Sequence, residues 1–169
     1  MASEIWDLYD AQGRKTGQTM RRSEAIPAGL YHRCVHIWPM NSRGEFLIQQ
    51  RAESVQWKPG LWSVTGGCAV SGEDIWAAAH RELREELGYQ AAEGEVRHIA
   101  TLRRANAFCG VFALFTDMPP EAFLLQKEEV SAVAWCGISQ LEQMLVDGRL
   151  HHYGHAYFKL LFDYRRGHI

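Results

Sequence analysis

The pattern of hydrophobic and polar residues predicts a chain of short strands with one inserted helix and two helices near the end. Strands are predicted at 4–9, 15–20, 31–39, 45–51 and 61–65, where apolar and β-branched residues lie between turn-forming Gly, Pro and Asn. Further strands are predicted at 96–104, 108–116 and 130–136. Asn41 to Gly44 is a strong turn, so the strands on either side of it are expected to form a hairpin.

The helices are marked by composition and by their end signals. Trp76 to His80 is rich in alanine, Ser71 and Asp74 resemble a capping arrangement before it, and Gly88 stands where a helix would end. Segments 138–146 and 153–164 are also predicted to be helical, the second with apolar residues at helical spacing. This order of elements predicts an α/β (α+β) fold, an α/β/α sandwich with a mixed β-sheet between helices.

Composition and charge narrow the class of protein. The 169 residues are interpreted as one domain, 1–169, and 47% hydrophobic with 22% charged residues is ordinary for a globular protein. A net charge of −2 argues against non-specific nucleic-acid binding. No signal peptide or membrane-spanning run is visible, and four scattered cysteines are typical of reduced thiols, so we expect a cytoplasmic protein without a membrane partner.

The predicted helix before Gly88 carries an unusual concentration of carboxylates. Glu82, Glu85 and Glu86 are three or four residues apart or adjacent, so they project from about one third of the helix circumference. Like charges at this spacing repel by a few tenths of a kcal/mol per pair unless a cation lies among them. Ligands that are all oxygen favour a hard divalent ion, Mg2+ or alternatively Mn2+, over zinc.

The spacing of the whole segment is more specific than the charge alone. Gly67 is followed after five residues by Glu73, and after seven more by Arg81-Glu82-Leu83, then Glu85-Glu86 and Gly88-Tyr89. This segment resembles the signature of the Nudix hydrolase family, G-x5-E-x7-R-E-U-x-E-E-x-G-U with U apolar, and all seven fixed letters match. Tyr89 departs from the aliphatic residue that is more common at the last position.

The resemblance implies roles for individual residues. Glu82, Glu85 and Glu86 would bind the metal with a contribution from the Gly66 carbonyl, while Glu73 and Arg81 would orient the carboxylates. A glutamate in a later loop completes the metal site or takes a proton from water in several members of the family. Glu129, just before the strand predicted at 130–136, is our preferred general base, with Glu85 and Glu73 as alternatives.

Outside this segment the chain resembles the isopentenyl diphosphate isomerase-like branch of the superfamily. The similar pieces include 6–10, 31–32, 44–51, 58–62 and 128–130. True isomerases use a cysteine in the loop after the Pro-Gly-x-Trp segment, but a glycine stands at that position of Ser63-Val-Thr-Gly-Gly67. With the hydrolase glutamates intact, this combination favours diphosphate hydrolysis over isomerisation.

Residues on the substrate side are indicated less directly. Arg51 and Lys58 flank the path into the Pro-Gly loop and are candidate phosphate contacts. Arg103 and Arg104 form a second pair, of which strand alternation should turn one toward the ligand side, and Arg103 is the candidate that we select. His32 is a candidate ligand through the isomerase resemblance. The alternatives stay open that the four cations are solvated surface residues and that His32 is a structural histidine. His151, His152 and His155 raise a zinc hypothesis, with a border of the substrate mouth or the surface as the favoured alternative.

The sequence therefore predicts a Mg2+-dependent hydrolase that cleaves a diphosphate bond in a nucleoside diphosphate derivative or a similar organic diphosphate, with water attacking phosphorus. The alternatives are an isoprenoid diphosphate isomerase and a non-catalytic Nudix module that senses a ligand. The partner is a small-molecule diphosphate, whose identity the motif does not indicate. The family resemblance allows a homodimer, although no part of the sequence indicates an interface.

Overall fold

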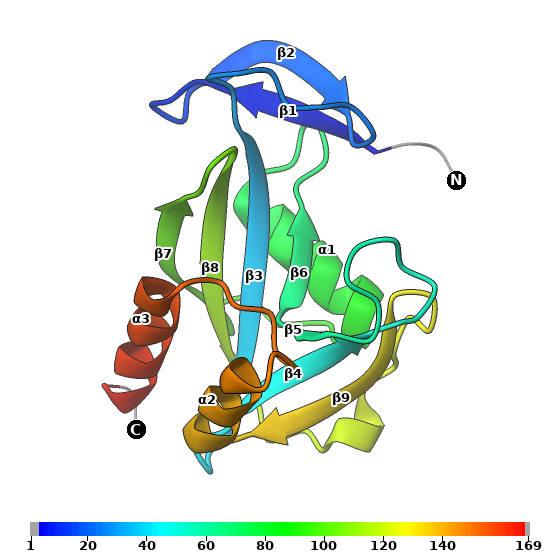
Figure 1. Cartoon of the computed structure of the whole chain (residues 1–169), viewed down its shortest axis with the longest axis vertical. Helices are drawn as coiled ribbons and strands as arrows, with labels where there is room; N and C mark the ends of the chain where they lie inside the picture. The colour runs from blue at the N-terminus through cyan, green and yellow to red at the C-terminus, as the bar shows by residue number, and fades with distance from the viewer. Residues whose placement is uncertain (1–3, 168–169) are drawn as a thin grey trace.

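The computed structural model describes residues 4–167, and its centre is a mixed sheet of seven strands (Figure 1). The strands are β3 (His32–Met40), β4 (Phe46–Arg51), β5 (Trp62–Ser63), β6 (Thr65–Cys68), β7 (Val96–Arg103), β8 (Ala107–Phe115) and β9 (Val130–Cys136). They run in the order β5-β4-β3-β8-β7, while β6 pairs with β3 and β9 with β4. Only β3 and β8 pair in parallel among the described strands.

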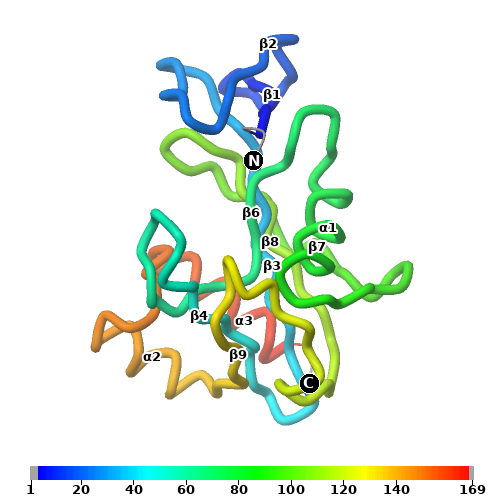
Figure 2. The backbone as a smooth tube through the Cα atoms, turned by 90° about the vertical axis from the view of Figure 1, so that its right-hand side faces the viewer, coloured from blue at the N-terminus to red at the C-terminus, as the bar shows by residue number. Residues whose placement is uncertain are grey.

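Three α-helices and a separate hairpin complete the described chain. The helices are α1 (Ile75–Leu87), α2 (Ile138–Val146) and α3 (His155–Arg166), with one 3-10 turn, η1 (Pro120–Ala122). An antiparallel pair, β1 (Ile5–Tyr9) and β2 (Lys15–Arg21), lies at one end of the sheet (Figures 1 and 2). It connects to the start of β3 through a bridge between Tyr9 and Tyr31.

The sheet separates two hydrophobic clusters because the side chains of β3 alternate between its faces. Val35 and Ile37 are fully buried in the cluster that holds the apolar side of α1. Trp38, also fully buried, packs on the other face with residues of α2 and α3. Figure 2 shows the sheet edge with α1 on one side and α2 and α3 on the other. The predicted α/β/α sandwich with a mixed sheet is confirmed.

Most predicted elements are present, with three instructive differences. The segment predicted as one strand at 61–65 is two short strands, β5 and β6, because Val64 turns into the core between them. The predicted hairpin begins as expected, with Gly44 N–H donating to the Asn41 carbonyl and Met40 pairing with Phe46. Beyond that pair, β4 leaves β3 and pairs with β9, which makes room for β6 beside β3.

The third difference concerns the start of α1. The cap is Asp74 alone, whereas the Ser71 hydroxyl donates to Asp7 of β1 at 2.9 Å. Asp7 also accepts the Gly72 N–H at 2.8 Å and pairs with Lys15 of β2 at 2.7 Å. These bonds tie the β1–β2 hairpin to the loop that leads into α1.

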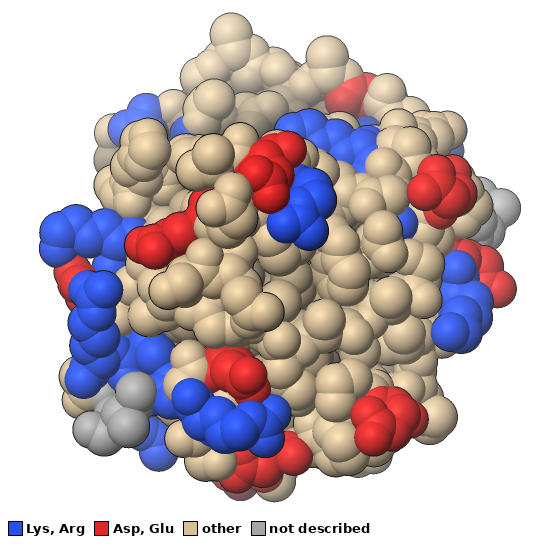
Figure 3. All heavy atoms as spheres, turned by 60° about the horizontal axis from the view of Figure 1, so that its bottom comes forward, with Lys and Arg blue, Asp and Glu red and all other residues tan. Residues whose placement is uncertain are grey.

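The surface and the helices agree with a globular protein of mixed charge. Within residues 4–167, the helices are too short or too polar to cross a lipid bilayer. On the face shown in Figure 3, acidic and basic side chains are interspersed around a largely uncharged centre.

Candidate active site

Helix α1 is held firmly at both ends, which fixes the direction of its side chains. Asp74 accepts hydrogen bonds from the backbone N–H groups of Trp76 and Ala77 at 2.9 and 2.8 Å. Gly88 ends the helix with φ of 62°, and a Cβ there would lie 2.5 Å from Leu124. The buried residues of the helix are Ala78, Ala79, Glu82, Leu83, Glu86 and Leu87.

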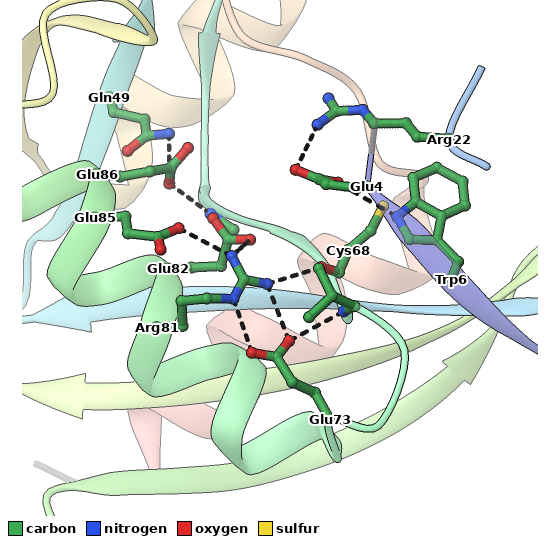
Figure 4. Close-up of polar contacts among 12 residues, drawn as sticks. Glu4, Trp6, Arg22, Gln49, Cys68, Glu73, Arg81, Glu82, Glu85 and Glu86 are labelled. Atoms are coloured by element: carbon green, nitrogen blue, oxygen red, sulfur yellow. Dashed lines mark hydrogen bonds and ion pairs between the residues drawn. The ribbon is translucent and has the colours of Figure 1, made fainter. Parts of the chain in front are cut away.

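Glu82 and Glu86 lie one turn apart on the buried side of α1, facing β6 (Figure 4). Their exposed fractions are 9% and 3%, so neither carboxylate is solvated as a surface glutamate would be. Glu85 lies beside them with 47% of its side chain exposed. The structure thus brings the three predicted metal ligands to one place, with two of them buried and the third at the rim.

Glu86 is held by two donors on different strands. The backbone N–H of Gly66 and the side-chain amide of Gln49 both donate to its Oε2, at 2.9 and 3.0 Å. The hydroxyl of Thr65 donates to Gln49 Oε1 at 3.0 Å and so orients the amide. Because both donors use Oε2, the second oxygen of Glu86 is available to a cation.

Arg81 is the centre of the other half of the network. Its guanidinium donates twice to Glu73, at 2.9 and 3.1 Å, and also to the Cys68 carbonyl at 2.9 Å. The same side chain donates to Glu82 Oε1 at 2.9 Å and to Glu85 Oε2 at 3.0 Å. Arg81 therefore fixes two of the three carboxylates, while Glu73 fixes Arg81.

The buried carboxylates are costly to ionise in the absence of a cation. Burial raises the pKa of Glu82 to about 7, opposed by the neighbouring Arg81 charge. Burial and the like charge of Glu82 raise the pKa of Glu86 well above its ordinary value, despite the bonds from Gly66 and Gln49. The site holds more negative charge than its protein partners neutralise, and a divalent cation would correct this imbalance.

Two glycines of β6 are required by the close packing of α1, β6 and β3. A Cβ at Gly66, where φ is 154°, would lie 2.0 Å from the Val35 carbonyl oxygen. A Cβ at Gly67 would lie 2.2 Å from Glu82 Oε1. The glycine pair therefore lets the strand approach the carboxylates, as the sequence motif requires.

Glu129 comes from a distant part of the chain to the same region. Its carbonyl accepts the Ala52 N–H at 2.8 Å, which anchors the loop before β9 against the end of β4. The negative charge of Glu129 contributes to the raised pKa of both Glu82 and Glu86. The exposed Glu129 side chain is thus an acidic neighbour of the buried pair.

A cavity of about 620 Å3 opens beside the glycine pair. Two of the predicted substrate residues, Arg51 and His32, are in its wall. The Arg51 side chain donates to the Trp57 carbonyl at 2.7 Å and lies 5.0 Å from the Trp57 ring centre. Lys58 also lies near that ring, with Nζ 5.1 Å from its centre, and contacts His151 Nδ1 at 2.9 Å. A basic and aromatic rim therefore borders the cavity.

His32 is buried in the same wall, and one of its ring nitrogens has no hydrogen-bond partner. Its ring stacks on Trp6 at 4.5 Å, and burial lowers its pKa. Within the described residues, His32 Nδ1 has no hydrogen-bond partner. A neutral, unpartnered imidazole nitrogen beside a cavity is suited to contact a ligand or a bound water.

Arg103 does not reach this cavity. Its side chain donates to the Tyr31 hydroxyl and lines a different cavity with Arg33 and Phe108. Arg104 points to the α3 side, where its guanidinium lies 5.9 Å from the Tyr157 ring centre. Arg104, rather than the selected Arg103, is therefore the member of the pair that lies near Cys34 and His36 in the cavity wall.

The three histidines before α3 do not converge on one point. His151 lies between Trp57, Tyr153 and Lys58, and burial with the Lys58 charge lowers its pKa to about 4. His152 and His155 instead stack edge to face at 4.8 Å and line a groove between α2 and α3. His151 thus borders the cavity rim, and the other two lie away from it.

Two features of the site are absent from the sequence predictions. Gln49, which orients Glu86, is a buried amide in β4 (Phe46–Arg51). A polar residue that follows three apolar ones in this strand is the feature of the sequence that could have indicated its role. Cys34 and His36 form part of the cavity wall on β3. Cys34 and His36 are two residues apart in one strand, so the sequence predicts that their side chains share a face of the sheet. Their proximity to Cys109 could not be predicted, because it depends on the parallel pairing of β3 with β8.

The donor set on α1 fits a hard divalent cation. It consists of carboxylate oxygens close to a glycine-containing strand, the ligand type that Mg2+ and Mn2+ prefer. Two of the carboxylates are buried next to each other, an arrangement that is favourable when a cation shares their charge. Fold and site together define an α/β/α protein with a partly buried carboxylate cluster on its inserted helix.

The family model of the NUDIX domain matches residues 30–156, and the chain belongs to the Nudix family. The chain is 30% identical over 146 residues to an uncharacterized Nudix hydrolase of Listeria monocytogenes, with 86% of each protein covered. It is 32% identical over 159 residues to Nudix hydrolase 3 of Arabidopsis thaliana, covering 86% of this chain but only 21% of that protein. An isopentenyl-diphosphate Delta-isomerase of Pectobacterium atrosepticum is 41% identical over 87 residues, about half of each chain.

Solved structures agree with the fold. A protein of Deinococcus radiodurans superposes with a TM-score of 0.78 at 24% identity, covering 93% of this chain and 97% of that one. The Nudix domain of Shewanella oneidensis NrtR, solved with ADP ribose, superposes with a TM-score of 0.53 at 20% identity, covering 66% and 75%.

Proposed function

We propose that this chain is a Mg2+-dependent hydrolase that cleaves a diphosphate bond in a nucleoside diphosphate derivative or a similar organic diphosphate, by attack of water on phosphorus. Membership of the Nudix hydrolases supports the reaction class. The observation that carries the proposal is the buried pair Glu82 and Glu86, adjacent to the acidic Glu129 and to a cavity with a basic rim.

In this proposal Glu82, Glu85, Glu86 and the Gly66 carbonyl hold the cation, with Mn2+ as an alternative to Mg2+. The cation, when bound, neutralises the diphosphate and lowers the pKa of water. Arg81 and Glu73 are positioning residues. The carboxylate of Glu73 accepts two hydrogen bonds from Arg81 and a third from the Val70 N–H at 3.0 Å. These bonds are what a positioning residue needs, and they argue against Glu73 acting as a general base.

Glu129 is the proposed general base, with Glu85 as the alternative. Glu129 is exposed, and its side chain has no bond to a described residue that would hold it away from a water molecule. Glu85 already accepts a bond from Arg81 at 3.0 Å, which ties one of its oxygens. Replacement of Glu129 by Gln should lower kcat, whereas Glu128→Gln is the matched control.

On the substrate side, Arg51, Lys58 and His32 are proposed to contact phosphate oxygens. Trp57 lies near both cations and offers a flat apolar surface for the group attached to the diphosphate. Arg103 is left out because its side chain lines another cavity. The absence of clustered positive charge along the chain favours a small-molecule substrate over a nucleic acid.

A chromatographic screen for phosphate monoester and phosphate products tests this proposal. The substrates are ADP ribose, nucleotide sugars, dinucleotides, nucleoside di- and triphosphates and isoprenoid diphosphates, each with and without Mg2+. ADP ribose is included because a Nudix domain of similar fold is solved with it. With H2 18O, the label should enter a phosphate product. Label found only in the organic fragment, or no Mg2+-dependent turnover of any diphosphate, would contradict the proposal.

The second candidate is isomerisation of an isoprenoid diphosphate, which the partial match to an isomerase favours. A glycine of the Gly66–Gly67 pair occupies the position expected for the catalytic cysteine, and burial raises the pKa of the nearby Cys68 thiol to about 12, which keeps it protonated. Incubation with isopentenyl diphosphate separates the candidates, since an allylic product supports the isomerase and released phosphate the hydrolase. A non-catalytic sensor would bind a diphosphate without turning it over.

Location and assembly are further proposals. Four thiols without a spacing typical of a disulfide framework support a cytoplasmic location. The homodimer suggested by the family resemblance is tested by light scattering of the purified chain across a concentration series.

A further inference from the structure

Three potential metal ligands of a different chemical type gather on the opposite face of the sheet from α1. Cys34 on β3 pairs in register with Cys109 on the parallel strand β8. His36 is two residues further along β3, so its side chain projects from the same face as that of Cys34. The two sulfur atoms and an imidazole nitrogen all lie within 4.8 Å of one another.

The histidine of this cluster is already oriented. Nδ1 of His36 lies 2.9 Å from the Tyr157 hydroxyl, and Trp38 Nε1 donates to that hydroxyl at 2.7 Å. The indole nitrogen can only donate, so the hydroxyl is held from both sides. The hydroxyl oxygen has two lone pairs, so it can accept from both the indole N–H and a protonated Nδ1 of His36, and this tautomer leaves Nε2 of His36 for coordination.

The cluster also has an open side. Cys34 and His36 are partly exposed in the wall of the 620 Å3 cavity, whereas Cys109 is 1% exposed and closes the site from behind. Three protein ligands with a fourth position open to a cavity is the arrangement of zinc sites that accept an outside ligand.

Thiolate and imidazole ligands select a different cation from the carboxylates of α1. Two sulfurs and one nitrogen suit Zn2+ or Cu+, whereas Mg2+ prefers oxygen. Two thiolates would balance the charge of Zn2+, and the positive charge of Arg104 nearby favours the thiolate form of Cys34. Without a cation, the neighbouring Cys109 thiol and burial raise the pKa of Cys34 well above its ordinary value.

We propose that Cys34, His36 and Cys109 bind one thiophilic cation, Zn2+ being the expected ion, as a second metal site in the wall of the substrate cavity. The fourth position faces the cavity, so a water molecule or a group of the cavity's ligand would complete the coordination. The site is separate from the carboxylates of α1 and requires no turnover to be detected.

Cobalt is the probe for this site because Co2+ bound to thiolate gives a charge-transfer absorption that carboxylate-bound Co2+ lacks. The full chain is titrated with Co2+ in thiol-free reducing buffer, with excess Mg2+ present to occupy the carboxylates. We expect one equivalent with thiolate absorption, displaced by one equivalent of Zn2+. The band should disappear in Cys34→Ser and in Cys109→Ser, and persist in the matched control Cys136→Ser, whose thiol lies apart from the cluster.

A second measurement keeps the test independent of folding defects. Tyr157→Phe preserves the packing but removes the hydroxyl that holds His36, so Zn2+ affinity should fall by about tenfold. Circular dichroism checks that each variant is folded. A folded wild-type chain without thiolate absorption, or a band unchanged in both Cys34→Ser and Cys109→Ser, would overturn the proposal. Neither result bears on diphosphate hydrolysis, which is measured with Mg2+ alone.

Discussion

The two sides of the candidate active site are built in opposite ways. On the α1 side, Arg81 alone makes five hydrogen bonds, and Glu86 is fixed by donors from two strands. On the cavity side, Arg51 and Lys58 are held mainly by one exposed tryptophan, Trp57. The proposed metal ligands therefore lie in a firmly bonded framework, and the proposed phosphate contacts lie on a rim that has room to adapt.

This contrast explains why the chain reveals its reaction class more readily than its substrate. The α1 side is encoded in one continuous segment, so a change there should impair catalysis strongly. The cavity side is assembled from β3, β4 and the loops around Trp57 and His151, so single changes should have smaller, substrate-dependent effects. The predictions below test this difference in decreasing order of expected effect.

Replacement of Glu86 by Gln should have the largest effect. The amide retains the shape of the side chain but loses its negative charge. Its single oxygen is the one to which Gly66 and Gln49 both donate, so the second carboxylate oxygen, which is available to a cation in the wild type, is lost. We expect kcat with Mg2+ to fall by more than about 100-fold, since outer-shell partners alone are worth about 10–100-fold. Glu128→Gln is the control; a similar loss in both variants would contradict a specific role for Glu86.

Gly67→Ala should reduce activity by about 10–100-fold, because the added Cβ would lie 2.2 Å from Glu82 Oε1 and displace that carboxylate. Mg2+ affinity, measured by calorimetry, should fall with activity. Gly137→Ala is the matched control, as its φ is −71° and a Cβ would meet only Gln140 Oε1 at 3.8 Å. Full activity of folded Gly67→Ala would disprove the packing argument.

Arg51→Ala and Lys58→Ala should affect the substrate side. Each is expected to raise KM by about tenfold with a smaller change in kcat, because each removes one charged contact to a bound phosphate. Arg103→Ala should leave both constants unchanged, since Arg103 contacts Tyr31 in another cavity. The comparison fails if Arg103→Ala raises KM as much as Lys58→Ala.

The smallest effect concerns stability and pH. The pKa of Glu82 in the folded protein is about 7, above its ordinary value of 4.5, so the folded state binds more protons than the unfolded state between these values. The unfolding free energy of the metal-free protein should therefore fall as pH rises through this window, by at most about 1.4 kcal/mol per pH unit for one group.

Chemical denaturation in EDTA measures this slope. Glu82→Gln should lose less stability than wild type between about pH 5 and pH 8. Saturating Mg2+ should stabilise the wild type most at the upper end of that range, where the carboxylates are ionised. Equal slopes in wild type and Glu82→Gln would show that the burial of this group does not govern the pH dependence.

Much of the fold follows from local patterns, because strand alternation, Asp74, Gly88 and the Asn41–Gly44 turn each determine nearby backbone. The carboxylate group also follows from spacing, since a helix places positions 82 and 86 on one side regardless of the rest of the fold. What the sequence does not reveal depends on tertiary pairing. Ser71 contacts Asp7 rather than the helix, because the β1–β2 hairpin folds onto this loop.

The direction of an isolated side chain is equally a property of the assembled sheet. The sequence offered Arg103 and Arg104 as a pair and we selected Arg103, but only their neighbours Tyr31 and Tyr157 in the folded chain distinguish the two. The histidines at 151, 152 and 155 are close in sequence, yet the extended backbone before α3 turns His151 toward Trp57 and away from the other two. The proximity of Cys34 to Cys109 likewise exists only because β3 and β8 pair in parallel.

The central claim, that the carboxylates of α1 form a site for a hard divalent cation, is tested most directly by the binding of Mn2+. Electron paramagnetic resonance of free Mn2+ reports the fraction bound without requiring a substrate. We predict that the wild-type chain binds at least one equivalent, that Mg2+ competes for it, and that a folded variant with Glu82→Gln and Glu86→Gln does not bind. Binding of Mn2+ by that variant with wild-type affinity would contradict the account.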